Sequence, residues 1–221
     1  MKWVYKLERK IGRYAIPNLM LYITTTTLFV YLADLLLPIS VSSYLAMVPS
    51  AVFRGQIWRL VTYIFIPPTT SPIFLLFTLY FYYIVGNWLE AAWGSFKFNV
   101  YYFIGMIGTT LASLFTGFGT AFYLNMSLFF AYAMLWPDHE VLIFFVIPVK
   151  IKYLAYLDAA LFLLSFLMGS WGARLAIIMS LLNFFLFFGR SILQTIKDRQ
   201  RYRSVRNNFN KQMKRNDNYR W

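Results

Sequence analysis

The chain of 221 residues has no cysteine, one histidine and few acidic residues. Without cysteine it cannot form a disulfide, a thiolate metal site or a cysteine nucleophile. The single histidine, His139, lies between Asp138 and Glu140 outside the long apolar segments, so we expect a solvated turn residue. Charged residues make up only 13% of the chain, about half the share usual in soluble domains. A water-soluble protein of this size would have too little polar surface to cover itself.

The apolar residues that dominate the chain come in long blocks. Hydrophobic residues make up 60% of the sequence and aromatic residues 21%. A helix that crosses a bilayer needs about 20 consecutive, mostly apolar residues. The sequence therefore predicts an all-α integral membrane protein with six transmembrane helices, over residues 16–37, 72–92, 98–115, 120–136, 151–168 and 173–188.

Two apolar segments do not have the length or pattern of a span. Residues 38–71 mix apolar residues with prolines, a glycine and two arginines, which favours short amphipathic helices at the membrane surface. Residues 141–149 are apolar but short, and Pro148 interrupts them, so they are predicted to be an interfacial segment.

Basic residues are concentrated at the two ends of the chain. Five of the 21 lysines and arginines lie within the first 13 residues and ten lie within 190–221, in a chain with a net charge of +13. Such a charge could indicate nucleic-acid binding. Basic residues that flank apolar spans, however, mark the cytoplasmic side of a membrane, so no specific nucleic-acid partner is expected.

Six spans place both termini on one side of the membrane. If that side is cytoplasmic, 18 basic residues lie inside and 3 lie outside, namely Arg54, Arg59 and Arg174. We therefore predict a cytoplasmic N-terminus over 1–15, a membrane domain over 16–189 and a cytoplasmic tail over 190–221 that contacts anionic lipid headgroups. The bacterial plasma membrane is the expected location, with the endoplasmic reticulum as the alternative.

Three motifs carry a family resemblance. They are GQIWRLVTYIF at 55–65, which Pro67 and Pro68 follow, LEAAWGSFKFNVYYFIG at 89–105 and FVIPVK at 145–150. In this order and spacing, over about residues 15–190, they resemble the rhomboid family. That family includes intramembrane serine proteases and inactive relatives such as derlins. The resemblance implies a six-helix bundle whose long first loop folds into the outer leaflet.

The resemblance also implies structural roles for four residues, Trp58, Arg59, Glu90 and Gly94. Arg59 would bond backbone or carboxylate groups in the first loop, and Trp58 suits the headgroup level. Interfacial anchoring alone is the simpler interpretation of these side chains. Neither interpretation makes them catalytic.

The catalytic pair of the proteases is missing from the matching positions. The nucleophile would be a serine in a Gly-x-Ser-Gly setting near the outer end of the fourth span, where this chain has Phe122. Ser127 lies more than one turn deeper, where a hydroxyl is expected to bond its own helix. The family's Gly-Ala-His reads Gly-Ala-Arg174 here, and arginine cannot act as a base in a protein. His139 lies at the opposite end of the fourth span.

Several polar residues fall within the predicted spans, namely Asp34, Asn125, Ser127, Asp158 and Asn183. Such residues are costly in a membrane and often functional. Asp158 would be the proton relay of a transporter, or would bond a neighbouring helix or pair with Lys150 or Lys152. Arg174 is expected either to reach the headgroups or to pair with Asp34, Asn125 or loop carbonyls, and Asp34 is the favoured partner.

Three functional hypotheses follow. The first is an inactive rhomboid-like protein that binds transmembrane segments of other membrane proteins, for quality control, trafficking or scaffolding. The second is an active rhomboid protease, and the third is a small transporter or channel. The missing serine motif and histidine favour the first over the second, and the lack of an inverted repeat speaks against the third. No enzymatic activity, cofactor or metal is expected.

Overall fold

The computed structural model describes residues 2–117, 119–143 and 147–189. Close packing groups residues 1–184 into one unit, and the described part of the second unit, 185–189, completes the last helix. The predicted basic tail, 190–221, and its contacts with lipid lie outside the described residues.

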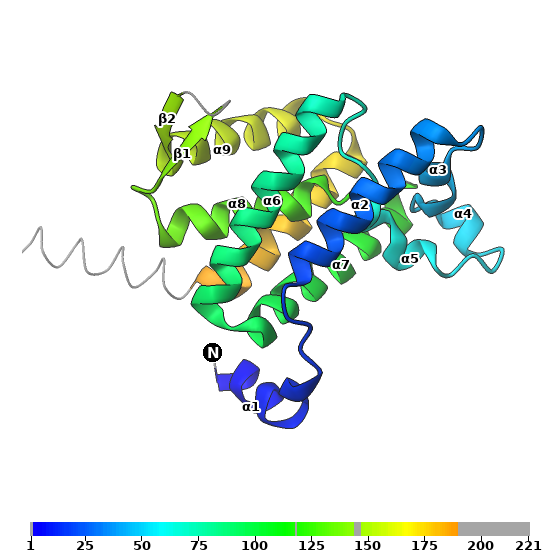
Figure 1. The fold of residues 1–221 in the computed structure, drawn as a ribbon. Helices are drawn as coiled ribbons and strands as arrows, with labels where there is room; N and C mark the ends of the chain where they lie inside the picture. Colours follow the sequence, from blue (N-terminus) through cyan, green and yellow to red (C-terminus); the bar gives the residue numbers. More distant parts are fainter. Residues whose placement is uncertain (1, 118, 144–146, 190–221) are drawn as a thin grey trace, which may run out of the picture. The chain divides into compact units, whose positions relative to one another are not determined.

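Five helices in the described residues are long and apolar enough to cross a membrane. They are α2 (Leu19–Leu36), α6 (Pro72–Trp93), α7 (Ser95–Thr116), α9 (Ile151–Met168) and a last helix, Trp171–Gly189 (Figure 1). Their bounds lie within a few residues of the predicted ones, because prolines and glycines interrupt the apolar blocks. The prediction of a helical, multi-pass membrane protein is confirmed.

The fourth predicted span, over residues 120–136, is shorter than expected. It forms α8 (Phe122–Leu135), whose 14 residues rise only about 21 Å. A hydrocarbon core is about 30 Å thick. Helix α8 begins late because Gly117, with φ of 85°, follows the last residue of α7, Thr116, and a short loop comes next. Pro137 comes just after the last turn of α8.

The first loop forms a run of short helices, as predicted. These are α3 (Val41–Leu45), α4 (Pro49–Val52), α5 (Arg59–Thr62) and the 3-10 turn η2 (Tyr63–Phe65). The Ser40 side chain caps α3 by accepting a hydrogen bond from the Ser43 amide. Met47, fully buried, pairs through its backbone with Gly119, which ties this loop to the entrance of α8.

The segment between α8 and α9, predicted as an interfacial segment, folds into a β-hairpin. Strand β1 (Glu140–Ile143) pairs antiparallel with β2 (Ile147–Lys150). Valine and isoleucine favour strands, and Pro148 is tolerated because both strands of a two-stranded sheet are edges. The prediction that this segment does not span the membrane is unaffected.

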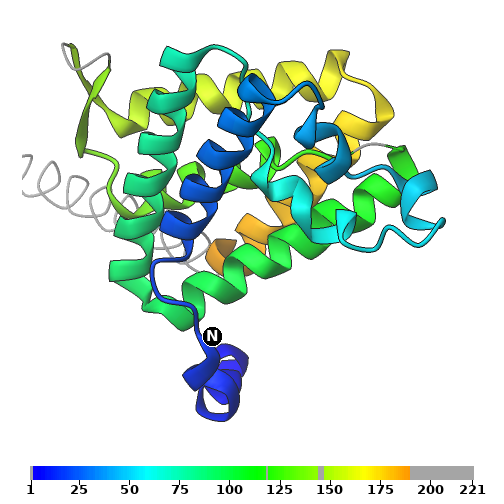
Figure 2. The ribbon, with the colours of Figure 1, turned by 45° about the vertical axis from the view of Figure 1, so that its right-hand side comes forward.

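Helix α6 is the centre of the bundle. It packs along α2, α7 and α8, and α9 packs on α8. Figure 2 shows α2 and α6 side by side, as does Figure 1, with α1 (Lys2–Ile11) and the turn η1 (Gly12–Tyr14) beyond the turn that joins α6 to α7. Lys97 at the start of α7 lies over the Tyr5 ring, 4.1 Å from its centroid, and holds α1 there.

Candidate functional site

A cavity of about 360 Å³ lies inside the bundle, close to the first loop. Its walls come from α2, η2, α6 and the entrance of α8, and Pro67 and Pro68 of the first loop close one side. It reaches the surface of the bundle at Pro68 and at Phe122, which is 45% exposed. A space of this size between helices forgoes packing contacts within the bundle, which favours a functional role for it.

Hydroxyl groups line much of the cavity. Thr24 and Thr27 donate to backbone carbonyls of their own helix at 2.7 and 2.8 Å. The Tyr63 hydroxyl donates to the Met106 carbonyl at 2.9 Å, and burial raises its pKa to about 12, so it stays protonated. These hydroxyls already have hydrogen-bond acceptors within the bundle, so they make the cavity wall polar but uncharged.

Asn125 is different, because part of its polar side chain has no partner. It is 7% exposed and lines the cavity, and its buried Oδ1 accepts no hydrogen bond from the described residues. Its side chain faces the hydroxyl of Tyr82, from the middle of α6. A buried acceptor without a donor costs about 1–3 kcal/mol, so this amide is prepared to accept a hydrogen bond from a bound group.

The cavity lining has no group suited to serine proteolysis. Its residues include no serine, histidine, lysine or carboxylate. Phe122, at the predicted nucleophile position, lies at the mouth. Ser127 lies outside the lining, fully buried, where it donates to the Leu124 carbonyl at 2.7 Å and meets the Tyr101 hydroxyl at 3.1 Å.

Arg174 does not pair with Asp34, so the favoured prediction is wrong. Its Nε and Nη2 donate to the carbonyls of Phe166 and Leu167, both at 2.9 Å, and its guanidinium lies 5.2 Å from the Trp171 ring centroid. These carbonyls end α9, where a cation is favoured by the helix dipole. Asp34 instead accepts hydrogen bonds from the amide and hydroxyl of Ser42 and holds α3 against α2.

Arg59 organises the first loop from inside. It is 7% exposed, and its Nη1 donates to the carbonyls of Ser43 and Ala46, both at 2.7 Å, while Nε donates to Gln56 Oε1 at 2.6 Å. Trp58 is half exposed and donates through Nε1 to the Tyr44 carbonyl at 3.3 Å. Both side chains therefore hold the loop that borders the cavity.

Glu90 and Gly94 hold the end of the bundle opposite the first loop. Glu90 Oε1 accepts from the Asn18 amide at 2.8 Å and from the Ser95 hydroxyl at 2.6 Å, which links the start of α2 to the start of α7. Gly94 adopts φ of 82° at the tight turn between α6 and α7, a conformation that favours glycine. These two residues lie away from the cavity lining.

Asp158 and Asn183 occupy different surroundings. Asn183 is buried and donates to the Tyr101 carbonyl at 3.2 Å, which ties the last helix to α7. Asp158 does not pair with Lys152, because Lys152 bonds Asp138 at 2.7 Å. That hydrogen bond, and then the lysine charge, lowers the pKa of the exposed Asp138 carboxyl.

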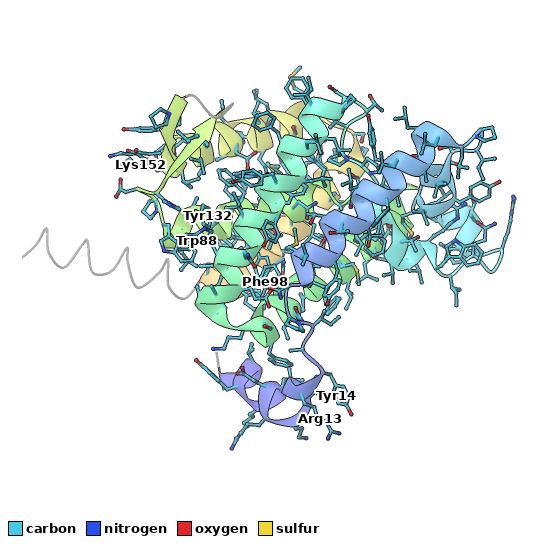
Figure 3. All side chains as sticks on the ribbon, in the orientation of Figure 1. Arg13, Tyr14, Trp88, Phe98, Tyr132 and Lys152 are labelled. Carbon is cyan, nitrogen blue, oxygen red and sulfur yellow. The ribbon has the colours of Figure 1, made fainter. Side chains whose placement is uncertain are left out.

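His139 is not a solvated turn residue. Its Nδ1 forms a hydrogen bond with the Tyr132 hydroxyl, and its ring lies 5.3 Å from that of Trp88. Trp136 contacts both Trp88 and Tyr132, at 5.6 and 5.2 Å between ring centroids. Figure 3 labels Trp88, Tyr132 and Lys152 near the base of the hairpin. The histidine is thus part of an aromatic cluster at the C-terminal end of α8. Phe122 begins the same helix at its other end.

Comparison with known protein families matches residues 19–189 to a family described as "Eukaryotic integral membrane protein (DUF1751)". The match covers well over half of the chain. The chain belongs to this family. A comparison with curated proteins found no match.

The family corrects the predicted location. The bacterial plasma membrane is wrong, because the family is eukaryotic. Composition and positive-inside charge describe how a chain lies in a bilayer, and they carry no information on which cell the bilayer belongs to. The chain is a multi-pass membrane protein of a eukaryotic cell.

Both termini are expected to be cytoplasmic, because 18 of the 21 basic residues then lie on that side. Epitope tags at each end should be accessible to antibody after digitonin, which permeabilises the plasma membrane alone. A lumenal control epitope should need full detergent permeabilisation. A tag at either terminus that behaves like the lumenal control would contradict the six-helix topology.

Asn125 and Phe122 could be predicted from the sequence as candidate residues, but the rest of the cavity wall could not. Tyr63, Tyr82, Thr24 and Thr27 come from three separate elements. The run of four threonines at 24–27 was the available signal, because polar residues are unusual in the centre of a span. Only the packing of α2 against α6 shows that two of them face inward.

Proposed function

We propose that this chain is a non-enzymatic, rhomboid-like membrane protein that receives a transmembrane segment of another membrane protein at its cavity. The observation that carries the proposal is the buried, unpartnered Oδ1 of Asn125 in a cavity that reaches the surface at Phe122. A polar residue of another membrane segment that reaches the cavity can supply the missing donor.

The absence of catalytic groups from the cavity lining supports binding over hydrolysis. A serine becomes a nucleophile only when a neighbouring base takes its proton. The lining offers hydroxyls and one amide, and Arg174 is turned toward the end of α9. A segment that enters the cavity would therefore form hydrogen bonds there without being cleaved.

Reconstitution with designed single-span helices tests the proposal. A photo-crosslinking residue is placed at Phe122, and a matched one at Phe115, an 84% exposed position on α7 outside the cavity lining. Helices of leucine and alanine carry either asparagine or leucine at their centre. We expect the asparagine helix to crosslink at 122 several times more than at 115, and Asn125→Leu to remove that preference. Equal crosslinking at the two positions for every helix would refute the proposal.

The purified protein is also expected to remain unlabelled by fluorophosphonate probes, which react with activated serines. Ser127 is fully buried and has no base beside it among its hydrogen-bond partners, Leu124 and Tyr101. An active rhomboid protease serves as the positive control and Ser127→Ala as the matched variant. Labelling that disappears in Ser127→Ala would establish an active serine and overturn the non-enzymatic assignment.

A further inference from the structure

Asp158 lies near mid-membrane depth on α9. It is seven residues after Ile151 and ten before Met168, roughly 10 Å and 15 Å along the helix from these two ends. It shares a stripe with Ile151 and Phe162, the two buried residues of this helix. Phe162 packs against Tyr123 and Phe130 of α8, at 5.6 and 5.1 Å between ring centroids. The carboxyl group is therefore directed to the side of α9 that meets the bundle.

No cation in the described part of the chain neutralises this group. Asp158 Oδ2 is buried and accepts no hydrogen bond from the described residues. Lys152, on the same helix, is held by Asp138, and Arg174 is held by the last carbonyls of α9. A carboxylate within the hydrocarbon core is expensive until a partner or a proton neutralises it. The described residues thus provide neither a cation for Asp158 nor a hydrogen-bond donor for its Oδ2.

The helix that carries Asp158 has room for a neighbour. Only 11% of the residues of α9 are buried inside the structure, whereas the share is 28–44% for the other four long helices. Leu157, Leu161 and Leu164 lie on the flank next to Asp158 and are more than half exposed, at 59%, 51% and 52%. A second helix packed on this flank would bring its own side chains beside the carboxyl group.

We propose that Asp158 selects transmembrane segments that carry a lysine or arginine at mid-membrane depth. This inference rests on the proposed function and adds the chemistry of the preferred partner. Charge complementarity identifies the partner, because a basic side chain in a neighbouring helix is the group that best compensates an intramembrane carboxylate. The apolar flank packs the partner helix, and the carboxylate fixes its register and depth.

The same host helices, now with lysine, leucine or glutamate at the centre, test the inference in proteoliposomes of the full-length protein. The photo-crosslinking residue replaces Leu161, one turn from Asp158. A control residue replaces Leu163, which is 60% exposed on the opposite face. We expect the lysine helix to crosslink at 161 about three to ten times more than the leucine helix, the range typical of a polar contact between membrane helices. No such preference is expected at 163.

Two substitutions of Asp158 complete the test. Asp158→Asn keeps the shape and should remove the preference for lysine, and Asp158→Lys should transfer the preference to the glutamate helix. Equal crosslinking of lysine and leucine helices at 161, together with asparagine-dependent capture at 122, would refute the charge selection and leave the proposed function standing. Failure of every helix at both positions would refute the two together. A lysine preference that persists in Asp158→Asn would also overturn the inference.

Discussion

Replacing Arg59 with alanine is expected to lower the melting temperature in detergent by about 5–15 °C. The substitution removes the donors that satisfy the carbonyls of Ser43 and Ala46 and the Gln56 amide oxygen, inside a loop where Arg59 is 7% exposed. Each buried acceptor left without a donor costs about 1–3 kcal/mol. The first loop should loosen and the cavity wall at Pro67 and Pro68 should lose its support.

Two further variants separate the donors of Arg59 from its charge. Arg59→Lys keeps the positive charge but cannot reproduce the planar fork of donors, so it should recover only part of the lost stability. Arg54→Ala removes an exposed arginine from the same loop and should leave the melting temperature within about 1–2 °C of the parent value. If Arg59→Lys were as stable as the parent, charge alone would explain the role of this residue.

The sequence was informative about the boundaries of helices. Pro72 and Gly94 predicted the start of α6 and the break between α6 and α7, because such residues begin or end helices by local backbone chemistry. The β-hairpin after α8 was missed, since its apolar residues are compatible with a strand, a buried helix or an interfacial segment. Length and local pattern cannot separate these states when the whole chain is apolar.

The site was harder to predict than the fold. In a soluble protein, the polar face of an element indicates which side is exposed, but lipid and core are both apolar here. The side chains of Thr27, Tyr82 and Asn125 converge only because α2, α6 and α8 pack together. Asp34 was the favoured partner of Arg174 because it is the one carboxylate expected near the same depth, whereas Arg174 bonds two carbonyls at the end of α9. Partner choice within a membrane bundle depends on helix rotation, which apolar composition does not encode.

Replacing Gly86 with alanine should disrupt the contact between α2 and α6. A Cβ at position 86 would lie 2.1 Å from Met20 Cγ and 2.6 Å from Met20 Cβ. The Met20 Cβ is fixed to the backbone, so a change of rotamer cannot relieve the clash and α2 itself must move. Overpacking of this kind costs about 1–3 kcal/mol. We expect the melting temperature in detergent to fall by about 3–10 °C.

Gly108→Ala is the matched control for this prediction. Gly108 also lies within a long helix, α7, but a Cβ there would meet Met179 at an ordinary 3.5 Å. Alanine is the better helix former, so this variant should be as stable as the parent or slightly more stable. Because residues of both α2 and α6 line the cavity, among them Thr27 and Tyr82, Gly86→Ala should also weaken capture of the asparagine helix at position 122. Equal melting temperatures for Gly86→Ala and Gly108→Ala would contradict the close contact between α2 and α6 at Met20. They would also contradict the cavity wall that these two helices form.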